Sequence, residues 1–115
     1  MVSILSKYQK WIGEWGERKF PDATLSGYLA HLDLEICEVQ EAATIFFNNP
    51  NQDTKRDFQM EIADVFILLL GISHRVGFDL LTAASDKHRI LKNRTWNPPD
   101  EFGIHHHIAE TTVAL

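Results

Sequence analysis

The sequence lacks the residues that a disulfide framework, a cysteine-rich zinc site or a membrane span would need. Cys37 is the one cysteine among 115 residues, so no internal disulfide can form and no zinc motif is present. The longest apolar run, residues 65–72, is far shorter than the roughly 20 residues of a transmembrane helix. Lys7, Gln9 and Lys10 interrupt any signal-peptide core. We therefore expect a cytoplasmic protein with no membrane partner.

An excess of positive charge is also lacking. The formal net charge is −5, which argues against a nucleic-acid partner because phosphate backbones favour basic surfaces. A nucleotide remains open as a ligand, since a bound metal ion can supply the positive charge. No glycine-rich phosphate loop and no serine or cysteine nucleophile pattern is present.

Apolar residues recur with helical spacing, and no stretch has the pattern of a strand. The spacing predicts an all-α, four-helix bundle-like protomer. The first helix is expected to fade through Gly13 and Gly16 and to end before Pro21. We predict one helical domain over residues 1–97 and, after consecutive prolines, an irregular tail over 98–115. The helices are expected at about 3–19, 26–47, 53–76 and 80–96.

The third predicted helix contains a run, residues 65–70, that is apolar on every side. A protomer of 115 residues can hardly surround a helix completely. A second subunit is the natural cover, so the run predicts a helical dimer interface.

Two acidic doublets carry the strongest chemical indication. Glu35 and Glu38 lie three apart in the second predicted helix, and Glu61 and Asp64 lie three apart in the third. Residues three apart share a helix face, so two facing helices would bring four carboxylates together. An all-oxygen set suits Mg²⁺, or Mn²⁺ as the second choice. The alternative is that the acids form two solvated helix faces.

A histidine and a basic helix end accompany the acids. His31 lies one turn before Glu35, where it could bind the metal, orient a carboxylate or be structural. Lys87 and Arg94 are seven apart, so on one helix they could reach the same polyphosphate, or they could be solvated charges. Glu-x-x-His, the motif of di-iron bundles, is absent, which favours magnesium over iron. The three tryptophans, at positions 11, 15 and 96, are expected to be packing residues.

These motifs resemble the MazG-like all-α nucleoside triphosphate pyrophosphohydrolases. The resemblance rests on Glu35-x-x-Glu38, on Glu61-x-x-Asp64 and on the ending Lys87-x6-Arg94-x-Trp96, and covers about residues 11–96. One departure concerns an asparagine expected three positions before the arginine. Leu91 stands there, and Asn93 adjoins Arg94 instead, which bears on local phosphate or sugar contacts.

The resemblance implies an enzyme that cleaves (d)NTPs, with the deoxy form favoured, into the monophosphate and pyrophosphate. It implies a homodimer or a dimer of dimers and a house-cleaning role in the nucleotide pool. Metal-ligand positions fall on the four acids, phosphate-binding positions on Lys87 and Arg94, and Glu38 is our candidate for the general base. His31, Asn93 and Trp96 are secondary candidates for ligand support or substrate contact. Two other hypotheses stay open: a non-catalytic dimeric interaction protein and a nucleotide-binding regulator. The base specificity does not follow from the sequence.

Overall fold

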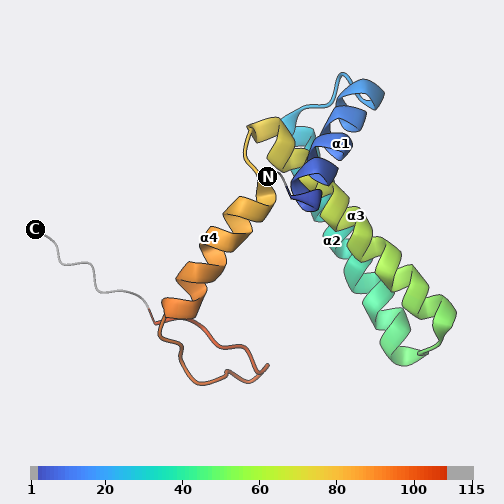
Figure 1. The fold of residues 1–115 in the computed structure, drawn as a ribbon. Coiled ribbons are helices and arrows are strands. Elements are labelled where there is room, and N and C mark those ends of the chain that lie inside the picture. Colours follow the sequence, from blue (N-terminus) through green and yellow to red (C-terminus); the bar gives the residue numbers. More distant parts are fainter. Residues whose placement is uncertain (1–2, 109–115) are drawn as a thin grey trace, which may run out of the picture. The chain divides into compact units, whose positions relative to one another are not determined.

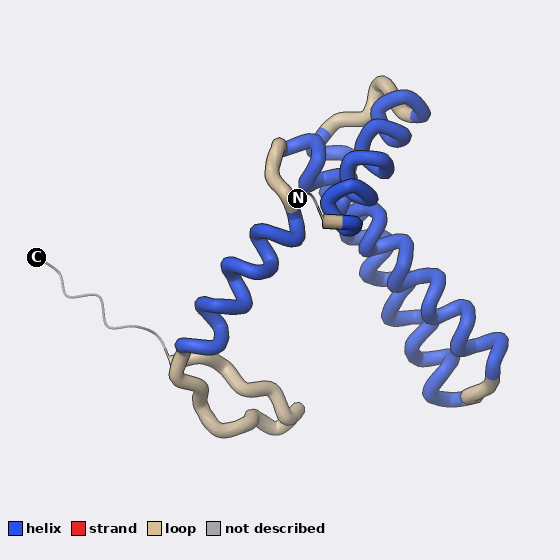
Figure 2. The backbone as a smooth tube through the Cα atoms, viewed as in Figure 1, coloured by secondary structure: helices blue, strands red, loops and turns tan. Residues whose placement is uncertain are grey.

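The computed structural model describes residues 3–108, which form four α-helices and no strand longer than a single bridge (Figures 1 and 2). The predicted all-α class is confirmed. The chain divides into two units, Met1–Leu81 and Thr82–Leu115, and each is described by itself. The predicted domain boundary at residue 97 stays a prediction. The helices are α1 (Ile4–Lys19), α2 (Leu25–Asn48), α3 (Gln52–Val76) and α4 (Leu80–Asn93).

In the first unit, α2 and α3 form a long antiparallel hairpin, and α1 packs on α3 (Figure 1). Polar side chains at the helix ends satisfy backbone groups that the helices leave unpaired. Thr24 caps α2 by accepting a hydrogen bond from the Gly27 amide at 3.0 Å. Asn51 and Thr54 form a reciprocal capping box at the start of α3. Gly77 ends α3 with φ +96°, a left-handed conformation that favours glycine.

Two close contacts attach α1 to the rest of its unit. Gly13 lies so near α3 that an added Cβ would come within 2.1 Å of the His74 ring. The same histidine contacts Glu17, with Nε2 2.7 Å from the carboxylate oxygen. Gln9 is buried and fully paired, since its amide donates to the Phe78 carbonyl and its carbonyl accepts from the Leu80 amide. The position of α1 is therefore specified by a small residue and by directional hydrogen bonds.

The helix ends correct two sequence-based expectations. The first helix does not fade at its glycines but continues through them to Lys19, because packing on α3 makes small residues favourable there. The fourth helix was predicted to reach Trp96 but ends at Asn93. At that end, the Asn93 side chain donates to the Arg89 carbonyl and the Trp96 indole donates to the Leu91 carbonyl. In a longer helix the Leu91 carbonyl would accept from the Thr95 amide, so the Trp96 indole occupies an acceptor that a continuing helix would use.

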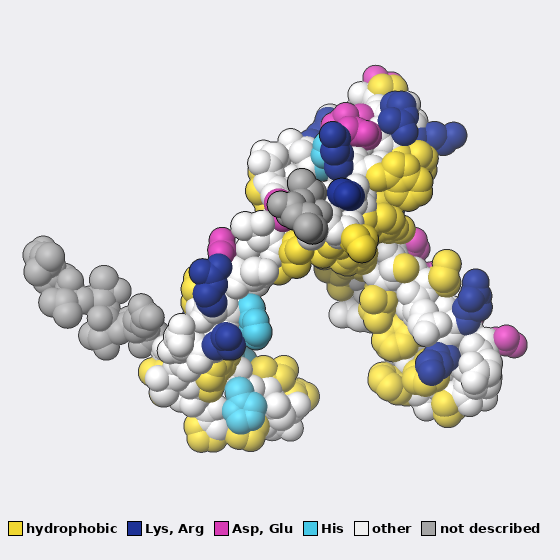
Figure 3. Space-filling model, viewed as in Figure 1, with side chains coloured by type: hydrophobic (Ala, Val, Ile, Leu, Met, Phe, Trp, Pro, Cys, Tyr) yellow, Lys and Arg dark blue, Asp and Glu magenta, His cyan; other side chains and the backbone are white. Residues whose placement is uncertain are grey.

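The apolar face of α2 is only partly covered within the protomer. Leu29 is 48% exposed and Ile36 is 42% exposed, although both lie on the apolar face of α2. On α3, Ile62 and Phe66 are exposed as well. Figure 3 shows apolar side chains on the surface over α1, α2 and α3. The one buried residue that α2 contributes is an acid, Glu35, so the inner face of the hairpin is polar at that level.

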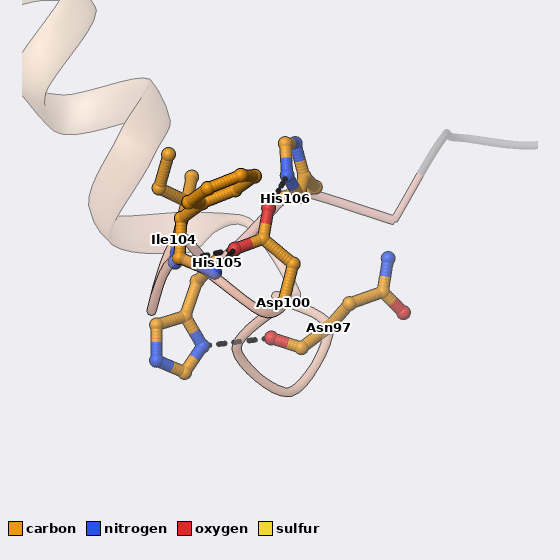
Figure 4. A network of polar contacts seen from close by, with 6 residues as sticks. Asn97, Asp100, Ile104, His105 and His106 are labelled. Carbon is orange, nitrogen blue, oxygen red and sulfur yellow. Dashed lines mark hydrogen bonds and ion pairs between the residues drawn. The ribbon is translucent and has the colours of Figure 1, made fainter.

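The second unit contains most of α4 and a loop closed by a single antiparallel bridge between Trp96 and His107. Asp100 organises this loop (Figure 4). Its carboxylate accepts from the Phe102 and Ile104 amides, both at 2.9 Å, and contacts the His106 ring. These contacts lower the pKa of Asp100, the His106 contact most of all. The described part of the predicted tail is therefore an ordered loop.

Among the described helices, none is by itself both long and apolar enough to cross a membrane, although α3 and α4 taken together would reach that composition and length.

The close approach at Gly13 yields a stability prediction. We expect Gly13→Ala to lower the free energy of unfolding by about 1–3 kcal/mol, the usual cost of overpacking, because the new methyl collides with His74. Thermal unfolding followed by circular dichroism measures this effect. Gly71→Ala is the matched control, since its Cβ would lie 3.6 Å from Tyr28, an ordinary contact. Equal stability of the two variants would contradict the role assigned to Gly13.

Candidate metal centre and adjoining pocket

The four predicted carboxylates converge in the structure. Glu35 and Glu38 from α2 and Glu61 and Asp64 from α3 each offer an oxygen, and these oxygens all lie within 4.8 Å of one another. The convergence follows from the antiparallel hairpin, which places two helical doublets at the same level. Spacing in the sequence therefore identified a genuine cluster in three dimensions.

Glu35 is buried and Glu61 is partly buried, which is uncommon for carboxylates. Glu35 is 9% exposed, while Glu38 and Asp64 remain accessible to solvent. The Oε2 atoms of Glu35 and Glu61 are buried, and within the described residues no donor forms a hydrogen bond with either atom. A buried acceptor without a donor is costly, so these oxygens are poised for a cation.

The electrostatics of the cluster also favour a bound cation. Burial is the main reason that the pKa values of Glu35 and Glu61 lie above the ordinary 4.5. The neighbouring carboxylates of Glu38 and Asp64 raise both pKa values further, because a like charge disfavours ionisation. His31 partly offsets the effect at Glu35. A divalent ion would reverse this balance by stabilising all four ionised acids.

The donor set fits a hard divalent cation. All four residues present carboxylate oxygens, which Mg²⁺ and Mn²⁺ prefer over softer donors. His31 is not a member of the converging group. Its Nε2 lies 2.8 Å from Oε1 of Glu35, so the imidazole orients a carboxylate from outside the cluster. Of the three roles left open for His31 by the sequence, this contact favours the orienting one.

The remaining predicted residues lie in the second unit. Lys87 is exposed on α4, whereas Arg94 follows the end of that helix, so the two do not share one helical face as predicted. Asn93 and Trp96 use their side-chain donors on backbone carbonyls of α4 and its end. A role of these four residues at the phosphates or the substrate stays a prediction.

A cavity of about 480 Å³ opens beside the acids, entirely within the first unit. Glu35 and Asp64 line one end, so the cavity is continuous with the carboxylate cluster. The other end is lined by aromatic residues, of which Trp15 and Tyr28 come from α1 and α2. Its volume lies in the range of small-molecule sites, about 300–1,000 Å³.

The sequence did not identify this aromatic end. Trp15 was expected to be a packing residue, and it does pack edge-on against Phe20, with ring centroids 5.7 Å apart. It is nevertheless 44% exposed and lines the cavity. Gly16, next to it, was the available signal, because a glycine inside a helix beside aromatic residues often permits a close approach.

These features define a class: an all-α protein with a partly buried carboxylate cluster suited to divalent metal and a cavity with aromatic lining beside it. No protein-family model matches the chain. A dATP/dGTP diphosphohydrolase of Salmonella phage PMBT28 is 31% identical over 109 residues, which are 95% of this chain. The chain spans about a third of the length of that relative.

A solved structure gives the more specific likeness. The MazG-like pyrophosphohydrolase of cyanophage S-2L, bound to dGDP and three catalytic Mn²⁺ ions per active site, has 27% sequence identity and a TM-score of 0.67. The match covers 94% of this chain and 100% of that one. The resemblance read from the motifs is confirmed: over nearly its whole length the chain is similar to a MazG-like all-α pyrophosphohydrolase.

The raised pKa values determine the sign of a pH dependence. A carboxyl group with a higher pKa in the folded protein binds more protons when folded, so stability falls as pH rises from 4.5 through the folded-state pKa. In the presence of a metal chelator, the melting temperature of the wild type should therefore fall as the pH rises through this range, and it should fall more than that of Glu35→Gln. At neutral pH, Mn²⁺ or Mg²⁺ in excess should raise the wild-type value by on the order of 5 °C.

The same titration in Glu35→Gln provides the control, because that variant loses one raised pKa and one metal ligand. Differential scanning fluorimetry with and without metal measures both effects. A wild-type melting temperature that is indifferent to metal would exclude a structural response of this cluster to divalent ions.

Proposed function

We propose that the chain is a metal-dependent nucleoside triphosphate pyrophosphohydrolase, which converts a (d)NTP and water into the (d)NMP and pyrophosphate. The observation that carries the proposal is the convergence of four carboxylates at one end of an open cavity. The names of the two similar proteins, a dATP/dGTP diphosphohydrolase and a MazG-like pyrophosphohydrolase, support the same reaction class.

Glu35, Glu38, Glu61 and Asp64 would hold the metal, Mg²⁺ by preference with Mn²⁺ as an alternative. Bound metal supplies charge neutralisation of the triphosphate and a lowered pKa for the attacking water. The buried pair, Glu35 and Glu61, would provide fixed ligands, because burial restricts their side chains. His31 would keep Glu35 oriented through its 2.8 Å contact.

Glu38 is the acid best placed to accept a proton from water. It is solvent-accessible, and it contacts both buried acids closely enough to raise the pKa of each. A carboxylate in that position can reach an attacking water while its neighbours remain bound to metal. We assign Glu38 the role of general base at the α-phosphorus.

A deoxynucleotide is the favoured substrate, since the similar proteins are a dATP/dGTP diphosphohydrolase and a pyrophosphohydrolase bound to dGDP. Removal of unwanted nucleotides from the pool is the role we propose, on the basis of the MazG-like resemblance. Lys87 and Arg94 are assigned to the β- and γ-phosphates, with Asn93 and Trp96 as secondary contacts.

A homodimer or a dimer of dimers is part of the proposal. The outward apolar stripes of α2 and α3, with Leu29, Ile36 and Ile62 each more than 40% exposed, leave a surface that a second copy would cover. Such pairing would extend the bundle around α3.

Replacing the proposed base tests the mechanism. Glu38→Gln should reduce kcat by about 10²–10⁴-fold, the usual contribution of a general base, because the amide cannot accept a proton. The assay incubates the protein with each dNTP and Mg²⁺ and separates the products by chromatography. Monophosphate and pyrophosphate are expected from the wild type.

Glu41→Gln is the matched control, since Glu41 lies nearly one turn further along α2 and outside the converging group. It should retain wild-type turnover. If Glu38→Gln turns over at a rate near wild type, Glu38 is not the base. If the wild type releases diphosphate and phosphate, the cleavage position assigned here is wrong.

The phosphate assignment generates a separate prediction. Lys87→Ala and Arg94→Ala should each raise KM for a dNTP by roughly tenfold or more, because each removes a charge-assisted contact with phosphate. Lys92→Ala is the control, as it removes a comparable charge from α4 without a proposed contact. Steady-state kinetics on the three variants give the result. Equal KM values for the three variants would mean that Lys87 and Arg94 are solvated charges without a phosphate contact.

A further inference from the structure

Gln9 is the one buried polar side chain of α1, with 6% of its surface exposed. Its amide bridges two backbone groups at the turn between α3 and α4. The Nε2 atom donates to the Phe78 carbonyl at 2.7 Å, and the Oε1 atom accepts from the Leu80 amide at 2.9 Å. Leu80 is the first residue of α4, so its amide is one of those that a helix cannot pair internally. Gln9 supplies that partner from 71 positions earlier in the chain.

The two hydrogen bonds fix the orientation of the Gln9 amide. With its nitrogen and oxygen exchanged, two donors would face each other at Leu80 and two acceptors would face each other at Phe78. An apolar side chain of the same length would fill the space but would deprive both backbone groups of this partner. Gln9 is therefore matched to the turn by the direction of its bonds as well as by its size.

This directional contact matters because the buried face of α1 has few side chains that interlock with α3. The buried residues recur at intervals of three and four and are Gln9, Ile12, Gly13 and Gly16. The two glycines permit a close approach, but they form few of the ridge-and-groove contacts that fix one helix along another. The contact of Glu17 with His74 also joins α1 to α3, but the Glu17 side chain is 61% exposed, so solvent weakens it.

The position of α1 along α3 decides the shape of the cavity. Ile12, Trp15 and Gly16 of α1 line it, whereas Gln9 is not among the described residues that do so. A shift of α1 by one residue would move these side chains by about 1.5 Å and turn them by about 100°. The four carboxylates lie on α2 and α3, so such a shift would change the cavity wall and leave the acids in place.

We infer that Gln9 is a positioning residue, which holds α1 against the α3–α4 turn in the register that completes the cavity wall. The inference rests on the proposed function only for the identity of the ligand, a nucleoside triphosphate. It adds a residue that acts through the placement of others. A cavity wall contacts the bound substrate and its transition state alike, so displacing the wall weakens binding and leaves the chemical step unchanged.

Gln9→Met tests the inference, because methionine has nearly the same length and forms neither hydrogen bond. Well below the melting temperature, this variant should raise KM for a dNTP with Mg²⁺ by roughly tenfold and change kcat by less than about twofold. In heteronuclear NMR spectra, the Trp15 indole resonance should move and the Leu80 amide should exchange faster with solvent. The Trp96 indole, which donates to the Leu91 carbonyl in the second unit, should not move and is the internal control. A fall in kcat at unchanged KM, or an unmoved Trp15 resonance, would overturn the inference.

Gln9→Glu is the conservative variant. When protonated, the introduced carboxyl group can donate to the Phe78 carbonyl and accept from the Leu80 amide, but when ionised it has no donor for the carbonyl. Burial raises the pKa of this group in the folded protein, so the stability that it provides at about pH 5 is lost as the pH rises to neutral. The melting temperature should therefore be close to that of the wild type at the lower pH and fall below it at the higher. The deficit of Gln9→Met should be the same at both pH values, and a Gln9→Glu deficit that does not change with pH would overturn the assigned pairing.

The NMR readouts do not depend on turnover, so the two proposals can fail separately. A wild type that turns over no dNTP, together with the expected responses of Trp15 and Leu80, would refute the proposed function and support the positioning role of Gln9. Turnover by the wild type with equal KM values in the wild type and Gln9→Met would support the function and overturn that role.

Discussion

Four carboxylates are held close together between α2 and α3, and their mutual repulsion opposes the folding of the first unit. Glu35 and Glu61 lose hydration on folding and gain no hydrogen-bond donor for one oxygen each within the described residues. The α2–α3 hairpin must therefore be stabilised elsewhere, and its polar inner face leaves much apolar surface outside. An arrangement that is unfavourable for a bare protein becomes favourable when a cation is bound, which is the usual logic of a metal centre.

The sequence was sufficient for the helices and the acid cluster because both depend on short-range spacing. Residues three apart on a helix share a face whatever surrounds them, so Glu35 with Glu38 and Glu61 with Asp64 could be placed without a structure. The predicted end of the third helix at residue 76 is local in the same way, since Gly77 follows it in a left-handed conformation that is costly for other residues.

Features that depend on tertiary contacts could not be read in this way. Leu29 and Ile36 are apolar residues at helical spacing, yet both are exposed within the protomer, because periodicity identifies an apolar face without saying which neighbour covers it. Side-chain hydrogen bonds from Asn93 and Trp96 to backbone carbonyls accompany the early end of α4, and helix propensity does not anticipate such bonds. The cavity arises from α1, α2 and α3 together, so the part played by Trp15 and Tyr28 required the arrangement of three helices.

The attachment of α1 has a consequence for ligand affinity. This helix carries Trp15 and Gly16, a wall of the cavity, and packs chiefly on α3 through the notch at Gly13 and the His74–Glu17 contact. A helix held at one interface can detach at a lower free energy than the whole domain unfolds. Each detachment would dismantle the aromatic wall, so the apparent affinity for a ligand is scaled by the fraction of molecules with α1 docked. Residues that contact no ligand thereby set how tightly one is bound.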